Sequence, residues 1–477
     1  MSAKSGRSLR PLIVWVVCVF LLSEGLARLL GIRFADNTLS FLYQYLDPEI
    51  LRHDLAKGLF FLHAQPPLFN FYLGATLKTF GSMSGAAFSF GFGVLGLALL
   101  LAMAWLMEEL GVSRNVNRVM CLLLACLPNF MVYRHWLFYT LPAAFLVLCC
   151  AVLLARYVGN GRRVDAHLFS WCAAALMLSR AVYHPLWLIA VLLVVVPLLE
   201  RSRRRALILS AVVPILVVNL VFLKNFLQVG AYSGSSWLGM NLAKRWPLSQ
   251  EEMTALHTEG HLPPVWHRRP FRAPDELRAY GYFQSEESVH PAIDAPYKSN
   301  GEPNFNHRDY ARISKEILRG DQYLIRRYPD RYLQRVLTSL LLFLQPGPNS
   351  VHFLVDYDFT KVQWVRDKVT RFVFLGGTVE RPIRMFAPPV NLWLIVFPAL
   401  LVYGCFRTFR PDGTKSDRWR SVFAYITVTV VWVTLTTNLI EIGENDRMRW
   451  EIEPLLTILL ACALTSLFQG AKQRSLR

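Results

Sequence analysis

The sequence has little acidic charge, and its cysteines form no framework. Only 33 of its 477 residues are Asp or Glu, against 51 Lys and Arg, which gives a net charge of +18. The cysteines stand inside apolar runs without the spacing of a metal site or of a disulfide scaffold, so redox chemistry is not expected. They are Cys18, Cys121, Cys126, Cys149, Cys150, Cys172, Cys405 and Cys462. The absence of any Asn-x-Ser/Thr acceptor weakly favours a bacterial inner membrane over a eukaryotic secretory one.

Internal repeats and low-complexity tracts are also absent, which argues against transporters built from inverted repeats. Apolar sequence, in contrast, is abundant. Hydrophobic residues make up 54% of the chain, and the mean hydropathy is +0.32. Many apolar runs approach the length of a membrane span, which excludes a soluble enzyme and predicts a polytopic membrane protein. The positive charge is interpreted as a topology signal and an attraction to anionic headgroups, and nucleic acid is not expected as a partner.

The apolar runs predict an all-α fold with about ten transmembrane helices, accompanied by amphipathic juxtamembrane helices and a mixed extracytoplasmic loop domain. The first run follows Lys4, Arg7 and Arg10 and lacks a small-residue cleavage site, so it is expected to be a retained span. The predicted spans are 11–31, 82–107, 117–133, 137–156, 166–181, 185–200, 206–226, 388–407, 420–439 and 453–469.

Lysine and arginine assign the orientation of these spans, because cytoplasmic loops carry an excess of both. The basic segments 162–163, 201–205, 407–420 and 472–477 all fall on one side. Both termini are then cytoplasmic, and the opposite face receives the loop 33–65, the turns at 133–135 and 180–184, the segment 227–387 and the loop 443–453. The sequence therefore predicts an active face outside the cytoplasm.

The predicted organisation has three parts. Residues 1–226 form an N-terminal transmembrane module whose first extracytoplasmic loop, 33–65, is expected to be catalytic. Residues 227–387 form an extracytoplasmic loop domain, and residues 388–477 form a C-terminal transmembrane module. The apolar run 332–344 is too short to cross comfortably and is expected to be buried or interfacial. The stretch 234–241 has no assigned role.

The segment 36–74 is a polar loop between two apolar segments. Apolar residues at helical spacing predict an amphipathic helix after Asp36, lying along the membrane face. Asp47-Pro48-Glu49 predicts the start of a second helix, because it combines a capping carboxylate, proline at the first position and an acid near the positive end of the dipole. His63 and Gln65 precede Pro66 and Pro67, which hold them in extended backbone.

Polar residues at the extracytoplasmic ends of the spans are candidates for chemistry, because charge at membrane depth is costly and usually functional. If the loops meet, one cavity holds a few carboxylates among many cations. Such a cavity suits an anionic leaving group beside a general base, since cations stabilise developing negative charge while a carboxylate takes a proton from the incoming hydroxyl. The candidates are Asp36, Arg134, His135, Arg180, His184, Lys224, Asn225, Glu444, Asn445, Arg447, Arg449, Glu451 and Glu453.

These features resemble the GT-C superfamily of multispan glycosyltransferases, which includes the protein O-mannosyltransferases and the lipid-A aminoarabinose transferase. Those enzymes follow the first span with an acidic residue or pair, and carry a (His/Lys)-Pro-Pro-Leu-Tyr motif later in the loop. Here Asp36 and the stretch His63-Ala-Gln-Pro-Pro-Leu-Phe69 stand at a comparable separation, and an Arg-x-Arg-x-x-x-x-Pro segment begins at Arg447. Two departures are Asn37 in place of a second acid, and Arg134-His135 in a turn where many relatives carry an acid.

The resemblance implies an inverting transfer of a sugar from a polyprenyl-phosphate donor to a glycan, glycolipid or protein hydroxyl, with Asp36 as the general base. The predicted catalytic residues are Asp36, Asp47, His63 and Gln65. The predicted donor-phosphate residues are Arg180, His184, Lys224, Arg447, Arg449, Arg134 and His135. Structural roles stay open for several of them. Asp36 and Asp47 could cap helices, His63 and Gln65 could fix the turn, and Arg447 and Arg449 could anchor at headgroups or pair with nearby glutamates.

No metal site is assigned, because no paired acid motif supports one, and no cofactor is expected with certainty. Asp36, Asp47 and Glu49 could supply oxygen ligands, so a divalent metal stays open. Membrane lipids are expected as partners. The alternative functions are a lipid-carrier flippase or transporter, which would need charged or broken spans near the bilayer midplane, and a polymerase or ligase of lipid-linked oligosaccharide, which differs in its donor.

Overall fold

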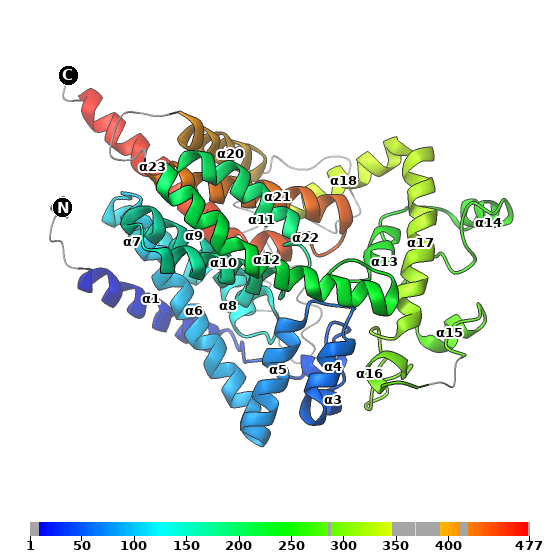
Figure 1. Cartoon of the computed structure of the whole chain (residues 1–477). Helices are drawn as coiled ribbons and strands as arrows, with labels where there is room; N and C mark the ends of the chain where they lie inside the picture. The colour runs from blue at the N-terminus through cyan, green and yellow to red at the C-terminus, as the bar shows by residue number, and fades with distance from the viewer. Residues whose placement is uncertain (1–8, 285–287, 346–367, 369–391, 411–417, 476–477) are drawn as a thin grey trace.

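The computed structural model describes residues 9–284, 288–345, 368, 392–410 and 418–475. Throughout this described part every regular element is a helix, and β pairing is limited to two isolated bridges. Helices long and apolar enough to cross a bilayer recur along the chain. The protein is therefore an all-α polytopic membrane protein, as predicted (Figure 1).

The bundle follows the predicted spans closely. By length and composition, five helical stretches of the described chain can span a membrane, and a sixth results if α7 and α8, which are bent by 60°, act as one span. Three shorter apolar helices, α11, α20 and α23, add to these, whereas α10 is only 15 residues long. The number of about ten spans stays a prediction, and residues 388–391 of the eighth lie outside the described residues. The bundle helices are α1 (Arg10–Leu29), α5 (Pro67–Phe80), α6 (Ser84–Glu109), α7 (Arg114–Cys126), α8 (Pro128–Arg134), α9 (Thr140–Asn160), α10 (Arg163–Met177), α11 (Pro185–Val195), α12 (Arg201–Val229), α20 (Trp393–Phe409), α21 (Arg420–Ile440) and α23 (Glu453–Ser475).

The first loop, 33–65, is more broken than its apolar spacing predicts. It holds three short helices, α2 (Thr38–Phe41), α3 (Pro48–His53) and α4 (Leu55–Phe61). The amphipathic helix expected after Asp36 ends at Leu42, which has extended backbone, and the amide of Leu46 donates to the Asn70 side chain instead of a helical carbonyl. The predicted start of α3 is confirmed, because the Asp47 side chain accepts from the amide of Glu49 and Pro48 opens the helix.

The segment after α12 forms a helical region beside the bundle. Its helices are α13 (Leu238–Ala243), α14 (Gln250–Thr258), α15 (Pro274–Arg278), α16 (Pro291–Asp294), α17 (Arg308–Arg327) and α18 (Pro329–Phe343). Figure 1 shows α14 to α17 at the side of the molecule away from α1. Gly239 lets α13 lie directly on α17, because a Cβ at that position would clash with the carbonyl of Ser314. The apolar run 332–344 falls mostly in α18, which packs on α21 and α22.

The loop before α23 is a buried helical turn. Between α21 and α23 the chain forms α22 (Asn445–Trp450), and all six of its residues are buried. It contacts α18, α21 and α9, so charged side chains of α22 lie inside the protein and not at its surface.

Candidate functional site

A paired strand-like segment joins the first loop to the turn before α9. The amide of Ala35 donates to the carbonyl of His135 at 2.7 Å, and the amide of Leu137 donates to Ala35 at 3.1 Å. Trp136, at the bridge, and Phe138 line one cavity, the central cavity. Arg134 and His135, at the C-terminal end of α8, line another, the lateral cavity.

The central cavity has a volume of about 270 Å³ and collects residues from loops that are distant in sequence. The first loop, the turns before α9 and α11, the region around α13 and the loop before α22 all contribute. Its lining is Leu42, Tyr43, Gln44, Gln65, Trp136, Phe138, Tyr139, Arg180, Trp237, Asn241, Lys244, Phe271, Glu441, Glu444, Arg447 and Met448.

Two buried arginines in this lining keep part of their hydrogen-bonding capacity unused. Arg180 Nε donates to Glu451 Oε1 at 2.7 Å and Nη1 donates to the Tyr139 hydroxyl at 3.0 Å. Arg447 Nη2 donates to Glu444 Oε2 at 2.6 Å. Within the described part of the chain, Arg180 Nη2 and Arg447 Nε and Nη1 are buried without a partner. Buried donors normally find an acceptor, so these nitrogens point to a bound anion.

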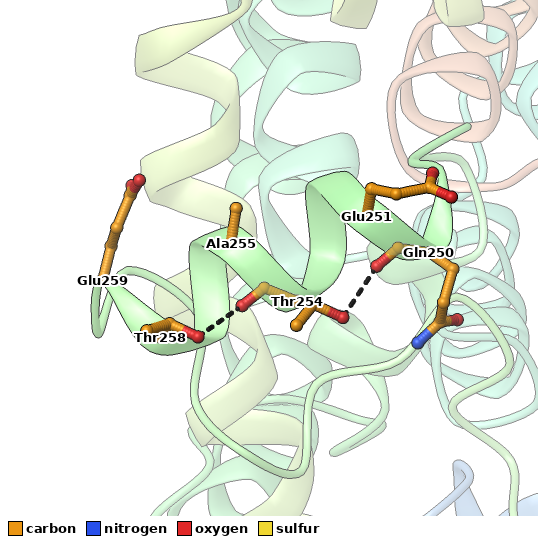
Figure 2. A pocket seen from close by; sticks show the side chains of 6 residues that line it. All are labelled: Gln250, Glu251, Thr254, Ala255, Thr258 and Glu259. Atoms are coloured by element: carbon orange, nitrogen blue, oxygen red, sulfur yellow. Dashed lines mark hydrogen bonds between the residues drawn. The ribbon is translucent and has the colours of Figure 1, made fainter.

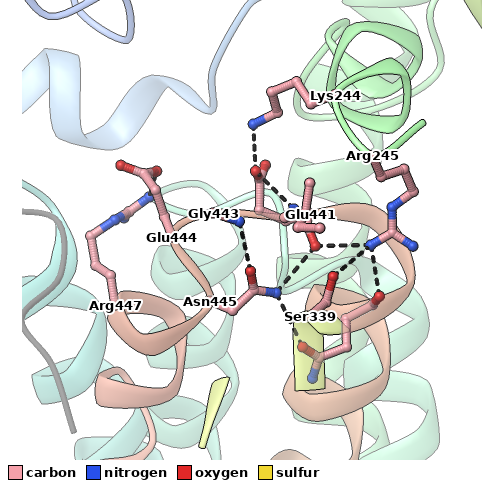
Figure 3. Close-up of polar contacts among 10 residues, drawn as sticks. Lys244, Arg245, Ser339, Glu441, Gly443, Glu444, Asn445 and Arg447 are labelled. Atoms are coloured by element: carbon pink, nitrogen blue, oxygen red, sulfur yellow. Dashed lines mark hydrogen bonds and ion pairs between the residues drawn. The ribbon is translucent and has the colours of Figure 1, made fainter. Parts of the chain in front are cut away.

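Two carboxylates of the same lining stand opposite cations. Glu441 accepts from Lys244, and Glu444 accepts from Arg447 (Figure 3). The Glu444 side chain is 26% exposed, whereas that of Arg447 is 1% exposed, so Glu444 is the accessible member of its pair. Burial raises the pKa of Glu444, but the charge and hydrogen bond of Arg447 outweigh it, so the pKa lies below its ordinary value. Glu444 is therefore ionised at neutral pH.

The backbone that carries these carboxylates is held from behind by Arg245. Its Nη2 donates to the carbonyls of Asn438 and Glu441 and to the Ser339 hydroxyl (Figure 3). The Asn445 side chain donates to the carbonyl of Glu441 and accepts from the amide of Gly443. These bonds fix the loop between α21 and α22, and with it the position of Glu441 and Glu444.

The remaining lining is uncharged and suits a sugar. Gln44, Gln65 and Asn241 provide amide groups that both donate and accept, which matches hydroxyl groups. Trp136 and Trp237 are among the aromatic rings of the wall, and Trp136 is stacked on Phe138. The cavity thus combines arginines, carboxylates, amides and aromatic rings.

Three of the predicted site residues, Gln65, Arg180 and Arg447, meet in the central cavity. Arg449 lies on the same helix as Arg447 but outside the lining. Its Nε is 3.3 Å from Glu453, and its guanidinium lies over the Trp393 ring at 4.9 Å. The structure does not bring the whole predicted cation set to one point.

Asp36 and Asp47 lie outside the central cavity. Asp36 is exposed, and its carboxylate lies against Gly85 at the start of α6. Asp47 caps α3 and also accepts from the amide and hydroxyl of Ser299, both at 2.6 Å, which ties the first loop to the region around α16.

His63, His184 and Lys224 make contacts that fix backbone. His63 Nδ1 is 2.9 Å from the Ser236 hydroxyl, and burial together with the charge of Lys224 lowers the pKa of His63 to about 3. His184 caps α11 by accepting from the amide of Leu186, and Lys224 Nζ donates to the carbonyl of Leu62. His63 and Gln65 have the non-helical backbone that the double proline predicts.

Arg134 and His135 belong to the lateral cavity, whose volume is about 510 Å³. It lies among α1, α6 and α8, and Arg134 pairs there with Glu24. Burial and the charge of Arg134 lower the pKa of His135 to about 4, so His135 is neutral at neutral pH. The sequence placed Arg134 and His135 with Arg180 and Arg447, but the paired segment separates the two sets.

Several lining residues of the central cavity were not identified from the sequence. Trp237 and Asn241 come from the unassigned stretch 234–241, Lys244 follows it, and Glu441 ends α21. Glu441 could have been found, because it is a polar residue at a span end. Trp237 and Asn241 could not, because their position depends on how α13 packs against α17.

A larger hollow of about 540 Å³ lies elsewhere, along α14 (Figure 2). Its walls come from a single helix, in which the Thr254 hydroxyl donates to the carbonyl of Gln250 and the Thr258 hydroxyl donates to the carbonyl of Thr254. It contains no cation and no convergent loops, so it is not a candidate for the chemistry described above.

Among the described residues, no group of three or more His, Cys, Asp or Glu side chains is arranged to hold a metal ion. The described residues therefore provide no ligand set for the divalent metal that the sequence left open.

No protein-family model and no curated protein matches the sequence. Among solved structures, the chain is similar to the oligosaccharyltransferase of Archaeoglobus fulgidus. One match is a complex of that enzyme with Zn and sulfate, with a TM-score of 0.42, 11% identity and coverage of 96% of this chain and 50% of the other. A second is the same enzyme tethered by a disulfide bond to an acceptor peptide containing the NVT sequon, with a TM-score of 0.42, 12% identity and coverage of 97% and 51%. This chain spans about half the length of that enzyme.

Proposed function

We propose that the protein is a membrane glycosyltransferase that moves a sugar from a polyprenyl-phosphate donor to an acceptor hydroxyl on the extracytoplasmic face. The observation that carries this proposal is the pair of arginines, Arg180 and Arg447, which line the central cavity and have buried nitrogens without a hydrogen-bond partner among the described residues. They supply hydrogen bonds and positive charge for a phosphate, while the amides and rings of the lining suit a sugar.

The reaction is a single displacement. The acceptor hydroxyl loses its proton to a carboxylate, its oxygen forms a bond to the anomeric carbon, and the bond from that carbon to the phosphate oxygen breaks. The polyprenyl phosphate leaves with the electron pair. Arg180 and Arg447 stabilise the negative charge that develops on it, so no acid is needed to protonate the leaving group.

Glu444 is the base that this geometry supports best. It lines the cavity, it is ionised at neutral pH, and part of its carboxylate is accessible. Asp36, the base that the resemblance implies, lies against Gly85 and outside the lining. The rates of sugar transfer by Glu444→Gln and by Asp36→Asn distinguish the two proposed bases.

The test uses the purified full chain in detergent with a mixture of radiolabelled polyprenyl-phosphate sugars. We expect a new glycosidic product from the wild type, and a loss of roughly a hundredfold or more in Arg447→Gln, because one positioned donor to developing charge is worth that much. Arg319→Gln, which changes an exposed arginine of α17, is the matched control and keeps full activity. Transport of labelled carrier across vesicles without a new glycosidic bond would instead identify a flippase.

A further inference from the structure

The lateral cavity collects more positive than negative charge. Arg28, Arg33 and Arg134 line it, and Glu24 is the carboxylate in its lining. The carboxylate of Asp36 lies nearby, against Gly85, which is one turn of α6 before the lining residue Ser89. Glu24 is already paired with Arg134. Arg28 and Arg33 are exposed, and neither has an ion-pair partner among the residues that the structure describes. Even with Asp36 counted, arginine is in excess, so the cavity attracts an anion.

The shape of α6 makes room for this cavity. Gly93 and Gly96 face the Arg134 side chain, and a Cβ at Gly96 would lie 3.2 Å from Arg134 Cγ. The Arg134 guanidinium therefore crosses the helix surface and donates to His135 Nε2, whose opposite nitrogen Nδ1 then carries the proton bonded to the carbonyl of Met131. The neutral His135 helps to fix the floor of the cavity.

The rim of the cavity faces the lipid. Phe90 and Val94 belong to the lining, lie on α6, and are 75% and 52% exposed. Exposed apolar side chains on a membrane-spanning helix contact acyl chains. Arg28 stands in the last turn of α1, where basic residues reach the headgroup region. Cationic groups and an apolar rim thus adjoin one another at the edge of the bundle.

We propose that the lateral cavity binds the phosphate headgroup of an anionic glycerophospholipid, with its acyl chains against α6. Arg28 and Arg33 contact the phosphate, and Phe90 and Val94 contact the first methylene groups. A donor phosphate at this position would be separated by the paired segments at Ala35 and Trp136 from Arg180 and Arg447. The cavity therefore suits a bilayer lipid that stays bound while the donor occupies the central cavity.

The test measures lipid binding to the purified full chain by native mass spectrometry, after delipidation and addition of phosphatidylglycerol, phosphatidylethanolamine or polyprenyl phosphate. Wild type is compared with Arg28→Gln/Arg33→Gln. We expect phosphatidylglycerol to bind roughly 25-fold more weakly to this double variant, because each of the two arginines near the phosphate contributes a factor of about five. Arg201→Gln/Arg205→Gln is the matched control, since it removes two exposed arginines from the predicted cytoplasmic end.

A second readout places the lipid. In the Phe90→Trp variant, brominated phosphatidylglycerol is expected to quench the new indole more strongly than brominated phosphatidylethanolamine does. Equal loss of binding in both arginine double variants would overturn the proposal, because it would indicate general charge attraction. Stoichiometric binding of polyprenyl phosphate, with no preference for phosphatidylglycerol, would also overturn it and would assign the lateral cavity to the donor. Arg28→Gln/Arg33→Gln is expected to keep sugar transfer. Measuring transfer by this variant therefore distinguishes failure of the lipid-binding proposal from failure of the proposed function.

Discussion

The central and lateral cavities share a wall and both present arginine, yet they differ in how that arginine is held. In the central cavity Arg180 and Arg447 are buried and fixed by Glu451 and Glu444, with a few nitrogens left over. In the lateral cavity, Arg28 and Arg33 are exposed beside lipid-facing side chains.

This difference suggests two kinds of anion site. Preorganised buried donors stabilise charge that develops during a reaction, because they need no rearrangement at that moment. Exposed arginines lose more side-chain entropy and are screened by solvent, so they suit a headgroup that is merely bound. The presence of arginine does not by itself mark the reactive site.

The largest effect expected from this comparison separates the two candidate bases. Glu444→Gln should lower the rate of sugar transfer by roughly a hundredfold or more, because it removes the carboxylate that accepts the proton. Asp36→Asn should lower it by less than about tenfold, because Asp36 lies outside the central cavity. Single-turnover transfer rates at saturating donor measure both. If Asp36→Asn lowered the transfer rate more than Glu444→Gln did, Asp36 would be the base and the reaction would take place beside the lateral cavity.

A smaller effect is expected from the ion pair of the lateral cavity. Arg134→Gln leaves the partly buried Glu24 without its arginine and should destabilise the protein by about 3 kcal/mol, without altering transfer by the folded molecules. Thermal unfolding in detergent measures the loss of stability. The double variant Glu24→Gln/Arg134→Gln should recover most of it. Full stability with abolished transfer in Arg134→Gln would contradict the structural role.

His135 adds a pH dependence of stability to the same cavity. Its pKa falls from 6.5 to about 4 on folding, because burial and the charge of Arg134 disfavour the charged ring. The unfolded chain therefore binds more protons between these values, and the folded protein loses stability as the pH falls from about 6.5 toward 4. His135→Gln should reduce the drop in unfolding temperature between pH 7 and pH 5. An unchanged drop would indicate that His135 is not buried as described.

The smallest effect is expected from metal removal. Transfer should change by less than about twofold in the presence of a chelator, because Arg180 and Arg447 supply the positive charge for the leaving phosphate. The assay is the same radiolabelled transfer with and without chelator, followed by addition of magnesium or manganese. Loss of transfer that either ion restores would give the divalent metal the role assigned here to arginine.

The sequence predicted the helical elements well and the site only in part. Apolar length determines the spans, and the Asp47-Pro48 signal correctly marks the start of α3. Local spacing failed after Asp36, where the expected helix ends after Phe41 and the amide of Leu46 donates to the side chain of Asn70. Local sequence signals cannot show that a distant side chain will replace a helical carbonyl as the hydrogen-bond acceptor of a backbone amide.

The site depends even more on distant packing. The rule that polar residues at span ends are functional identified Arg180 and Arg447, which meet in the central cavity. It could not separate His135 from Trp136, because the side to which each points depends on the pairing of Ala35 with the turn before α9. Nor could it identify Asn241, which reaches the cavity through the contact of α13 with α17.

The most direct test of the account is an experimental structure with polyprenyl phosphate bound. The account predicts density for the phosphate in the central cavity, within hydrogen-bonding distance of Arg180 Nη2 and of Arg447 Nη1 or Nε. Density for that phosphate beside Arg28 and Arg134, with the central cavity empty, would contradict it.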